Sequence, residues 1–83
     1  MEKITEIKYK IRKFIVETTY APESQVQNDT LIFALGIFDS MGFISLINFI
    51  EENFNIKAND SELIEENFES INALASFVER KLN

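Results

Sequence analysis

The strongest constraint on the fold is the stretch from Gly36 to Phe54, where a polar turn gives way to a long apolar pattern. Asp39 and Ser40 stand at the turn, and apolar residues follow at helical steps: Met41, Ile44, Ile47, Ile50 and Phe54. This pattern predicts a helix from Ser40 to about Asn53. Asp39 is the expected N-cap, because its carboxylate can accept from backbone N–H groups of the first turn. A phosphate on Ser40 would meet the same unpaired N–H groups.

Two further long helices and one short helix are predicted around this stretch. The first runs from about Ile4 to Thr18 and has one apolar face, because these residues recur at three- and four-residue steps: Ile4, Ile7, Ile11, Phe14, Ile15 and Thr18. A short helix follows Asp60 through about Glu66, and Ser70 caps a last helix that ends near Leu82. No alternating strand pattern is present. The expected fold is therefore all-α, a small helical bundle in one domain spanning residues 1–83.

A long connection joins the first two long helices, because Pro22 ends the first one and Phe38 precedes the second. Loops of this length are often functional. We expect it to be pinned by four apolar residues that enter the core, with a short turn of helix at Leu31 to Leu35: Val26, Leu31, Leu35 and Ile37. Gly36 is expected to supply a backbone angle that other residues resist.

The core is predicted from the apolar faces of the last two long helices. The buried set of the helix after Ser40 is Met41, Ile44, Leu46, Ile47, Ile50 and Phe54. The last helix turns Ile71, Leu74, Ala75, Val78 and Leu82 inward, with Phe77 at its edge. Phe43 and Phe49 either widen the buried face or leave one ring exposed as a docking contact. Phe43 is the better candidate for such a contact.

Composition excludes several functions. The 83 residues contain no cysteine and no histidine, which excludes disulfides, Cys/His zinc sites, Cys nucleophiles and Ser-His pairs. The acidic residues near Glu62 lack EF-hand spacing, so no metal site is expected. With 46% hydrophobic residues the chain makes one small core with little room for a substrate cleft, and we expect no enzyme. The N-terminus lacks the apolar segment of a signal peptide, which indicates a cytoplasmic protein without membrane insertion.

The charge distribution is uneven along the chain. Fourteen acidic and eight basic residues give a net charge of −6, which argues against nucleic acid or an anionic membrane as the main partner. Five of the eight basic residues nevertheless lie in the first 20 positions. A solvated helix face is the ordinary explanation of that basic run, and a docking role is the alternative.

The triplet Asp39-Ser40-Met41 permits a family assignment. It follows Leu35-Gly36-Ile37-Phe38 and opens an apolar helix ending in Glu51-Glu52, and in this it resembles the phosphopantetheine attachment site of acyl and peptidyl carrier proteins. The resemblance covers nearly the whole chain. It implies a four-helix bundle of the acyl-carrier type, with a long loop between the first and second helices. It also implies 4'-phosphopantetheine attached covalently to Ser40, with Asp39 as part of the motif.

A second Asp-Ser pair, Asp60-Ser61, tests this assignment. An Asp-Ser pair alone is most commonly just a helix cap. Ser61 lacks a preceding glycine and a following apolar helix, so it is a poor attachment candidate.

The resemblance also implies partners. These are a phosphopantetheinyl transferase, an adenylate-forming acyl or aminoacyl ligase, and downstream acyl-transfer or synthase enzymes acting on a monomer. The expected docking residues are Met41, Phe43, Ile44, Glu51 and Glu52. Gly42 and Ser45 stand where fatty-acid carriers usually have acids. The tetrad Asp39-Ser40-Met41-Gly42 is more similar to discrete carriers served by a ligase, including D-alanyl carriers.

Two alternatives remain open. One is a fatty-acid or polyketide synthase carrier. The other is an unmodified acidic interaction module that binds a basic partner through its helices.

Overall fold

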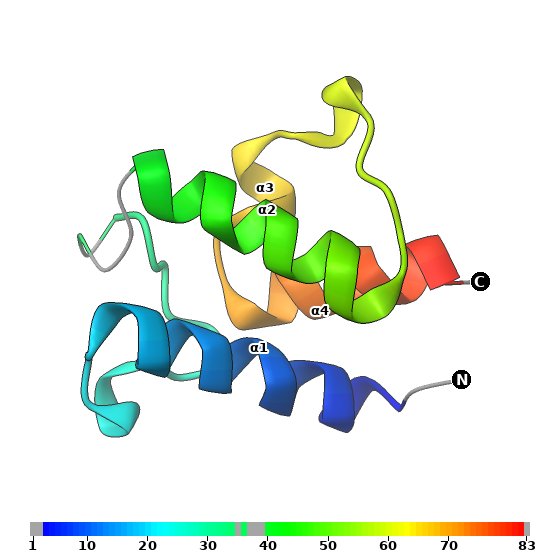
Figure 1. The fold of residues 1–83 in the computed structure, drawn as a ribbon. Helices are drawn as coiled ribbons and strands as arrows, with labels where there is room; N and C mark the ends of the chain where they lie inside the picture. Colours follow the sequence, from blue (N-terminus) through cyan, green and yellow to red (C-terminus); the bar gives the residue numbers. More distant parts are fainter. Residues whose placement is uncertain (1–2, 35, 37–39, 83) are drawn as a thin grey trace.

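The computed structural model describes residues 3–34, 36 and 40–82, and this part of the chain forms only helices, turns and loops (Figure 1). The described residues form three long helices and one short helix, which confirms the predicted helical bundle. In chain order the elements are α1 (Ile4–Thr19), the 3₁₀ turn η1 (Glu23–Gln25), α2 (Ser40–Phe54), the 3₁₀ turn η2 (Asp60–Glu62), α3 (Glu65–Phe68) and α4 (Ile71–Leu82).

Local chemistry sets the helix ends. Tyr20 follows the last residue of α1 and Asn55 follows the last residue of α2, and both lie in the left-handed region with φ of 58° and 54°. The predicted Ser70 cap of α4 is confirmed, because the Ala73 N–H donates to the Ser70 hydroxyl at 3.1 Å. Gly36 has a φ of +73°, which agrees with the prediction that it supplies a backbone angle that other residues resist.

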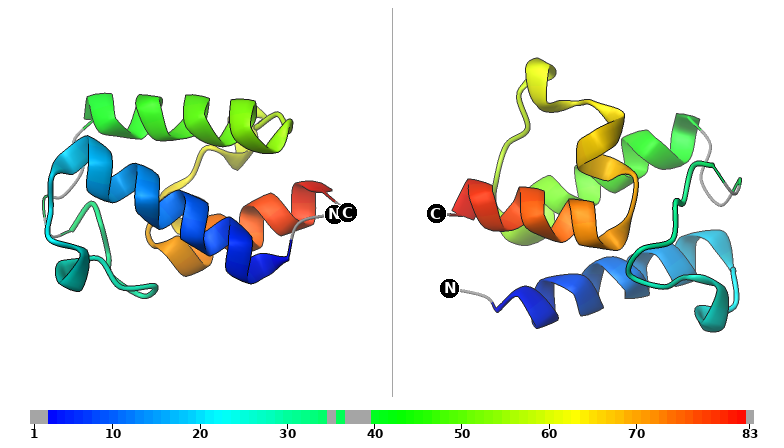
Figure 2. Two further views of the ribbon diagram at one scale, coloured as in Figure 1. Left: turned by 60° about the horizontal axis from the view of Figure 1, so that its bottom comes forward. Right: turned by 180° about the vertical axis from the view of Figure 1, so that it is seen from behind.

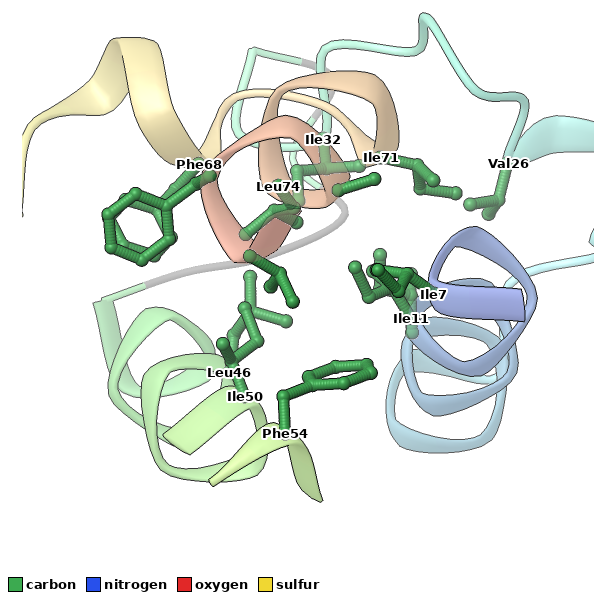
Figure 3. Packing of buried hydrophobic residues seen from close by; sticks show 14 residues of the cluster. Ile7, Ile11, Val26, Ile32, Leu46, Ile50, Phe54, Phe68, Ile71 and Leu74 are labelled. Carbon is green, nitrogen blue, oxygen red and sulfur yellow. The ribbon is translucent and has the colours of Figure 1, made fainter. Parts of the chain in front are cut away.

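The three long helices surround one apolar core. α1 runs antiparallel to both α2 and α4 (Figures 1 and 2), and α3 packs against α4. α1 packs more extensively against α4 than against α2. Figure 3 shows side chains from the three long helices and the loop meeting in this core, which comprises Ile7, Ile11, Ile15, Val26, Ile32, Leu46, Ile50, Phe54, Phe68, Ile71, Leu74, Ala75, Phe77 and Val78.

Two predictions about α2 are wrong. Met41 and Ile44 belong to the predicted buried set, but their side chains are 77% and 59% exposed. Leu46, Ile50 and Phe54 occupy the face of α2 that meets the core. Met41 and Ile44 project from a different face, because successive helical residues are rotated by about 100°.

Other placements also differ from the sequence prediction. Phe77 is 1% exposed and belongs to the core, whereas we expected it at the edge of α4. In the long loop Ile32 is buried in place of Leu31, which is 48% exposed. Residues 32–34 lie in a turn and not in a helix. The predicted turn of helix also included Leu35, which, like Ile37, lies outside the described residues.

The predicted short helix from Asp60 to Glu66 is divided into two elements. η2 begins after Asn59, whose N–H donates to the Glu62 carboxylate at 2.9 Å. The chain then leaves helical geometry at Leu63 and Ile64 before α3 starts.

Candidate functional site

The loop that leads to α2 is fastened to the rest of the bundle. Val26 and Ile32 are fully buried. The Ile32 N–H donates to the Glu69 carbonyl at 3.0 Å, and the Asn72 N–H donates to the Asn28 carbonyl at 2.9 Å. The Arg12 guanidinium also donates to the Asn28 side chain. The long connection is therefore pinned, as predicted, to α1 and to the start of α4.

A row of aromatic rings then fixes the first turn of α2. Phe33 in the loop meets Phe43 edge-on at 5.6 Å between ring centroids, and Phe43 meets Phe68 of α3 at 5.3 Å. Phe68 contacts Phe77 of α4, also at 5.3 Å. We call Phe33, Phe43, Phe68 and Phe77 the aromatic row. The row joins the loop, α2, α3 and α4, and its member on α2, Phe43, is three residues after Ser40 in sequence, so it sets the position of the start of α2.

Ser40 is the first residue of α2, as the sequence predicts. Asp39, its expected cap, lies outside the described residues. A 15-residue helix starting at Ser40 presents the unpaired N–H groups of its first turn next to this serine. That end of a helix favours negative charge, so a phosphodiester on Ser40 fits the local electrostatics.

The chain contains five other serines, and none of them begins a long helix. Ser24 and Ser61 lie in 3₁₀ turns, while Ser45 and Ser76 lie inside helices. Ser70 precedes α4 but is buried, and its hydroxyl accepts from the Ala73 N–H. Ser40 therefore differs from the other serines by its place at the head of a long helix.

The surface of α2 near its start is apolar. Met41 and Ile44 are exposed, and the first turn contains no acidic residue. Acidic side chains appear only near the end of α2, where Glu52 is exposed. The exposed surface of α2 is therefore apolar near Ser40 and negatively charged near the other end of the helix.

Two of the five expected docking residues have structural roles. Phe43 is half-buried within the aromatic row, so the structure favours the core alternative for this ring. Glu51 is also half-buried, and its carboxylate accepts from the Ala58 N–H at 2.9 Å. This bond ties the segment after α2 back to the helix. This bond could not be predicted from the sequence, because the contact depends on the path of residues 55–58.

The acidic residues around η2 do not gather into a metal site. Among the described residues, no group of three carboxylates is placed to hold an ion. Glu62 instead pairs with Lys81 at 2.9 Å. The Asn59 N–H and the Lys81 ammonium both donate to its carboxylate, and together they hold the pKa of Glu62 below its usual value of 4.5.

Comparison with protein families shows the family of the chain. Residues 10–78 match the family described as phosphopantetheine attachment site. The chain therefore belongs to the phosphopantetheine-binding carrier family, whose members hold 4'-phosphopantetheine covalently on a serine. No curated protein matches the sequence. In the part of the chain that the structure describes, no helix is long and apolar enough to cross a bilayer.

Proposed function

We propose that this carrier bears its phosphopantetheine arm on Ser40 and presents an acyl or aminoacyl group to successive enzymes. The proposal is supported by the position of Ser40, which begins α2 within the residues that match the family. The aromatic row holds the first turn of this helix. In the attachment reaction the Ser40 hydroxyl oxygen forms a bond to the β-phosphorus of coenzyme A. The phosphoanhydride bond breaks, adenosine 3',5'-bisphosphate leaves, and a base of the transferase accepts the hydroxyl proton.

The arm supplies the thiol on which cargo is held as a thioester, since the chain has no cysteine of its own. The protein's own residues place the arm and are recognised by partners. Holding the cargo on the carrier raises its effective concentration at each docked enzyme. We therefore assign the chain the role of a carrier, with the chemical steps performed by its partners.

The first test is intact mass after incubation with coenzyme A, Mg²⁺ and a broad-specificity phosphopantetheinyl transferase. The wild-type chain should gain one arm and one thiol that reacts with a maleimide, because the unmodified chain contains none. Ser40→Ala should gain neither. Ser61→Ala, which alters the other Asp-Ser pair, should be modified as fully as the wild type. A folded wild type that starts without an arm and gains none would leave the unmodified interaction module as the explanation.

We further propose that an adenylate-forming ligase loads the arm. Support comes from the apolar start of α2, where Gly42 and Ser45 replace the acids usual in fatty-acid carriers. The modified protein should accept a carboxylic acid from such a ligase with ATP, for example a D-alanine ligase with D-alanine. Loading by malonyl-CoA and a malonyl transferase instead would favour the fatty-acid or polyketide alternative.

For docking, we propose that partners contact Met41 and Ile44 beside Ser40 and Glu52 at the end of α2. Ile44→Ala should raise the KM of the transferase by about threefold, because it removes part of an apolar contact without disturbing the core. Ile64→Ala is the matched control, since Ile64 is similarly exposed at 47% but precedes α3. Equal KM values for the two variants would contradict this assignment.

A further inference from the structure

A groove between α1 and the second half of α2 lies apart from the attachment site. Tyr9, Lys10, Lys13 and Phe14 line it from α1, and Phe49 and Asn53 line it from α2. Its volume of about 490 Å³ falls within the range of protein ligand sites. Phe49 lies nine residues after Ser40, or roughly 13 Å along the helix axis. The groove therefore forms a surface distinct from the start of α2.

The floor of this groove is aromatic. Phe14 and Phe49 stack with ring centroids 4.2 Å apart, and Phe54 meets Phe49 edge-on at 6.3 Å. Phe54 is buried between α2 and α1 (Figure 3), whereas Phe14 and Phe49 are only half-buried. Tyr9 beside them is 65% exposed. Partly exposed rings of this kind can receive an apolar or aromatic side chain.

The charged residues of the groove are mainly positive. Lys10 and Lys13 are exposed, and the Lys10 ammonium lies 5.8 Å from the centre of the Phe54 ring. Glu17 supplies one negative charge on the same helix. Since the whole chain carries −6, an acidic ligand is repelled by most of the molecule and attracted to this face. The charge distribution thus selects both the sign of the ligand and its place of contact.

We propose that this groove, here called the aromatic–lysine groove, docks an acidic segment of a partner protein through an aromatic side chain flanked by carboxylates. The ring packs against Phe14 and Phe49, and the carboxylates pair with Lys10 and Lys13. A concave surface suits an inserted side chain better than a flat lipid surface, and a whole second copy of the chain, which also carries −6, is repelled more strongly than a short acidic segment. The proposal is independent of any modification at Ser40.

The test uses a synthetic peptide with a central phenylalanine between two glutamates on each side. Titration into ¹⁵N-labelled protein at low salt should shift the amide resonances of Tyr9, Lys13, Phe14, Phe49 and Asn53. A peptide with alanine at the centre should bind more weakly, and one with lysines in place of the glutamates should not bind. Ser40→Ala should bind the acidic peptide like the wild type, so that failure here is distinguishable from failure of the carrier assignment.

Charge reversal supplies the matched control. Lys13→Glu should weaken the acidic peptide at least about fivefold, because it replaces an attraction with a repulsion. Lys57→Glu changes the net charge equally but lies outside the groove, and it should weaken binding by less than about twofold. Equal losses in the two variants, or shifts confined to other residues, would overturn the proposal. The proposal would also be overturned if the protein bound anionic vesicles through Lys13 and did not bind the peptide. Dimerisation that Lys13→Glu abolishes would overturn it as well.

Discussion

Among single residues, Glu62 makes hydrogen bonds to several other segments of the chain, although it lies at the surface. Its carboxylate accepts from the Asn59 N–H, which closes η2, and from Lys81 in the last turn of α4. The Glu62 carbonyl also accepts from the Asn67 side chain at 2.8 Å, and Asn67 in turn accepts from Arg80 at 3.1 Å. One residue therefore ties the segment between α2 and α3 to the end of α4.

The lowered pKa of Glu62 predicts a pH dependence of stability. A depressed pKa in the folded state means that the ionised carboxylate stabilises the fold above the unfolded pKa, and that this contribution is lost as pH falls through the folded pKa. Glu62→Gln should therefore lower the free energy of unfolding near neutral pH. The difference from the wild type should shrink well below pH 4.5. Urea denaturation of both proteins at the two pH values measures it.

Glu79→Gln is the control for this effect, because Glu79 is exposed on the same helix as Lys81 and the substitution removes the same charge. It should leave the pH profile close to that of the wild type. A Glu62→Gln profile parallel to the wild type at all pH values would show that the carboxylate contributes nothing through its charge.

Residue roles set by local geometry could be predicted from the sequence, and roles set by contacts could not. The Ser70 cap and the positive φ of Gly36 depend on the neighbouring backbone, and both are confirmed. Periodicity predicts Met41 in the core, because it locates an apolar stripe but not the helices that cover it. The same limit placed Phe77 at an edge, although Phe68 covers its ring.

At the scale of elements, the start of α2 depends on contacts from three other segments. The buried Ile32 holds the loop, and the aromatic row continues from Phe33 through Phe43 to α3 and α4. The extent of α2 was predictable to within one residue because its apolar pattern is long. The aromatic row was not, since ring contacts between segments far apart in sequence leave no spacing to detect.

Removing the ring of Phe43, which links Phe33 of the loop to Phe68 of α3, should therefore loosen the start of α2. Phe43→Ala is expected to cost about 2–3 kcal/mol in the free energy of unfolding, less than a fully buried phenylalanine because the ring is half-buried. It should also slow arm attachment by the transferase at temperatures where the variant remains folded. Urea denaturation and the modification rate measure the two effects.

Ile44→Ala controls for the change of an apolar residue on the same helix. Ile44 is 59% exposed, so its truncation should alter stability by no more than about 0.5 kcal/mol. If Ile44→Ala proved the more destabilising of the two, the aromatic row would not be what holds this end of the helix.

At the scale of the whole molecule, the family match and the bundle agree with the carrier class inferred from Asp39-Ser40-Met41. The sequence motif located the start of α2, and the structure added the exposed apolar residues beside it. Charge is separated over the molecule, with lysines on α1 and most of the acids elsewhere. This separation supports our proposal of two docking surfaces of different chemistry, of which the sequence indicated only the basic run.

Fragmentation mass spectrometry after modification by the transferase tests directly whether the arm is attached to Ser40. Trypsin should release residues 14–57 as one peptide, because no lysine or arginine lies between Lys13 and Lys57. This peptide contains Ser24, Ser40 and Ser45, and its fragment ions distinguish the three. We predict that the arm is on Ser40 alone. An arm on Ser24 or Ser45, or on a peptide containing Ser61, Ser70 or Ser76, would contradict the proposed site.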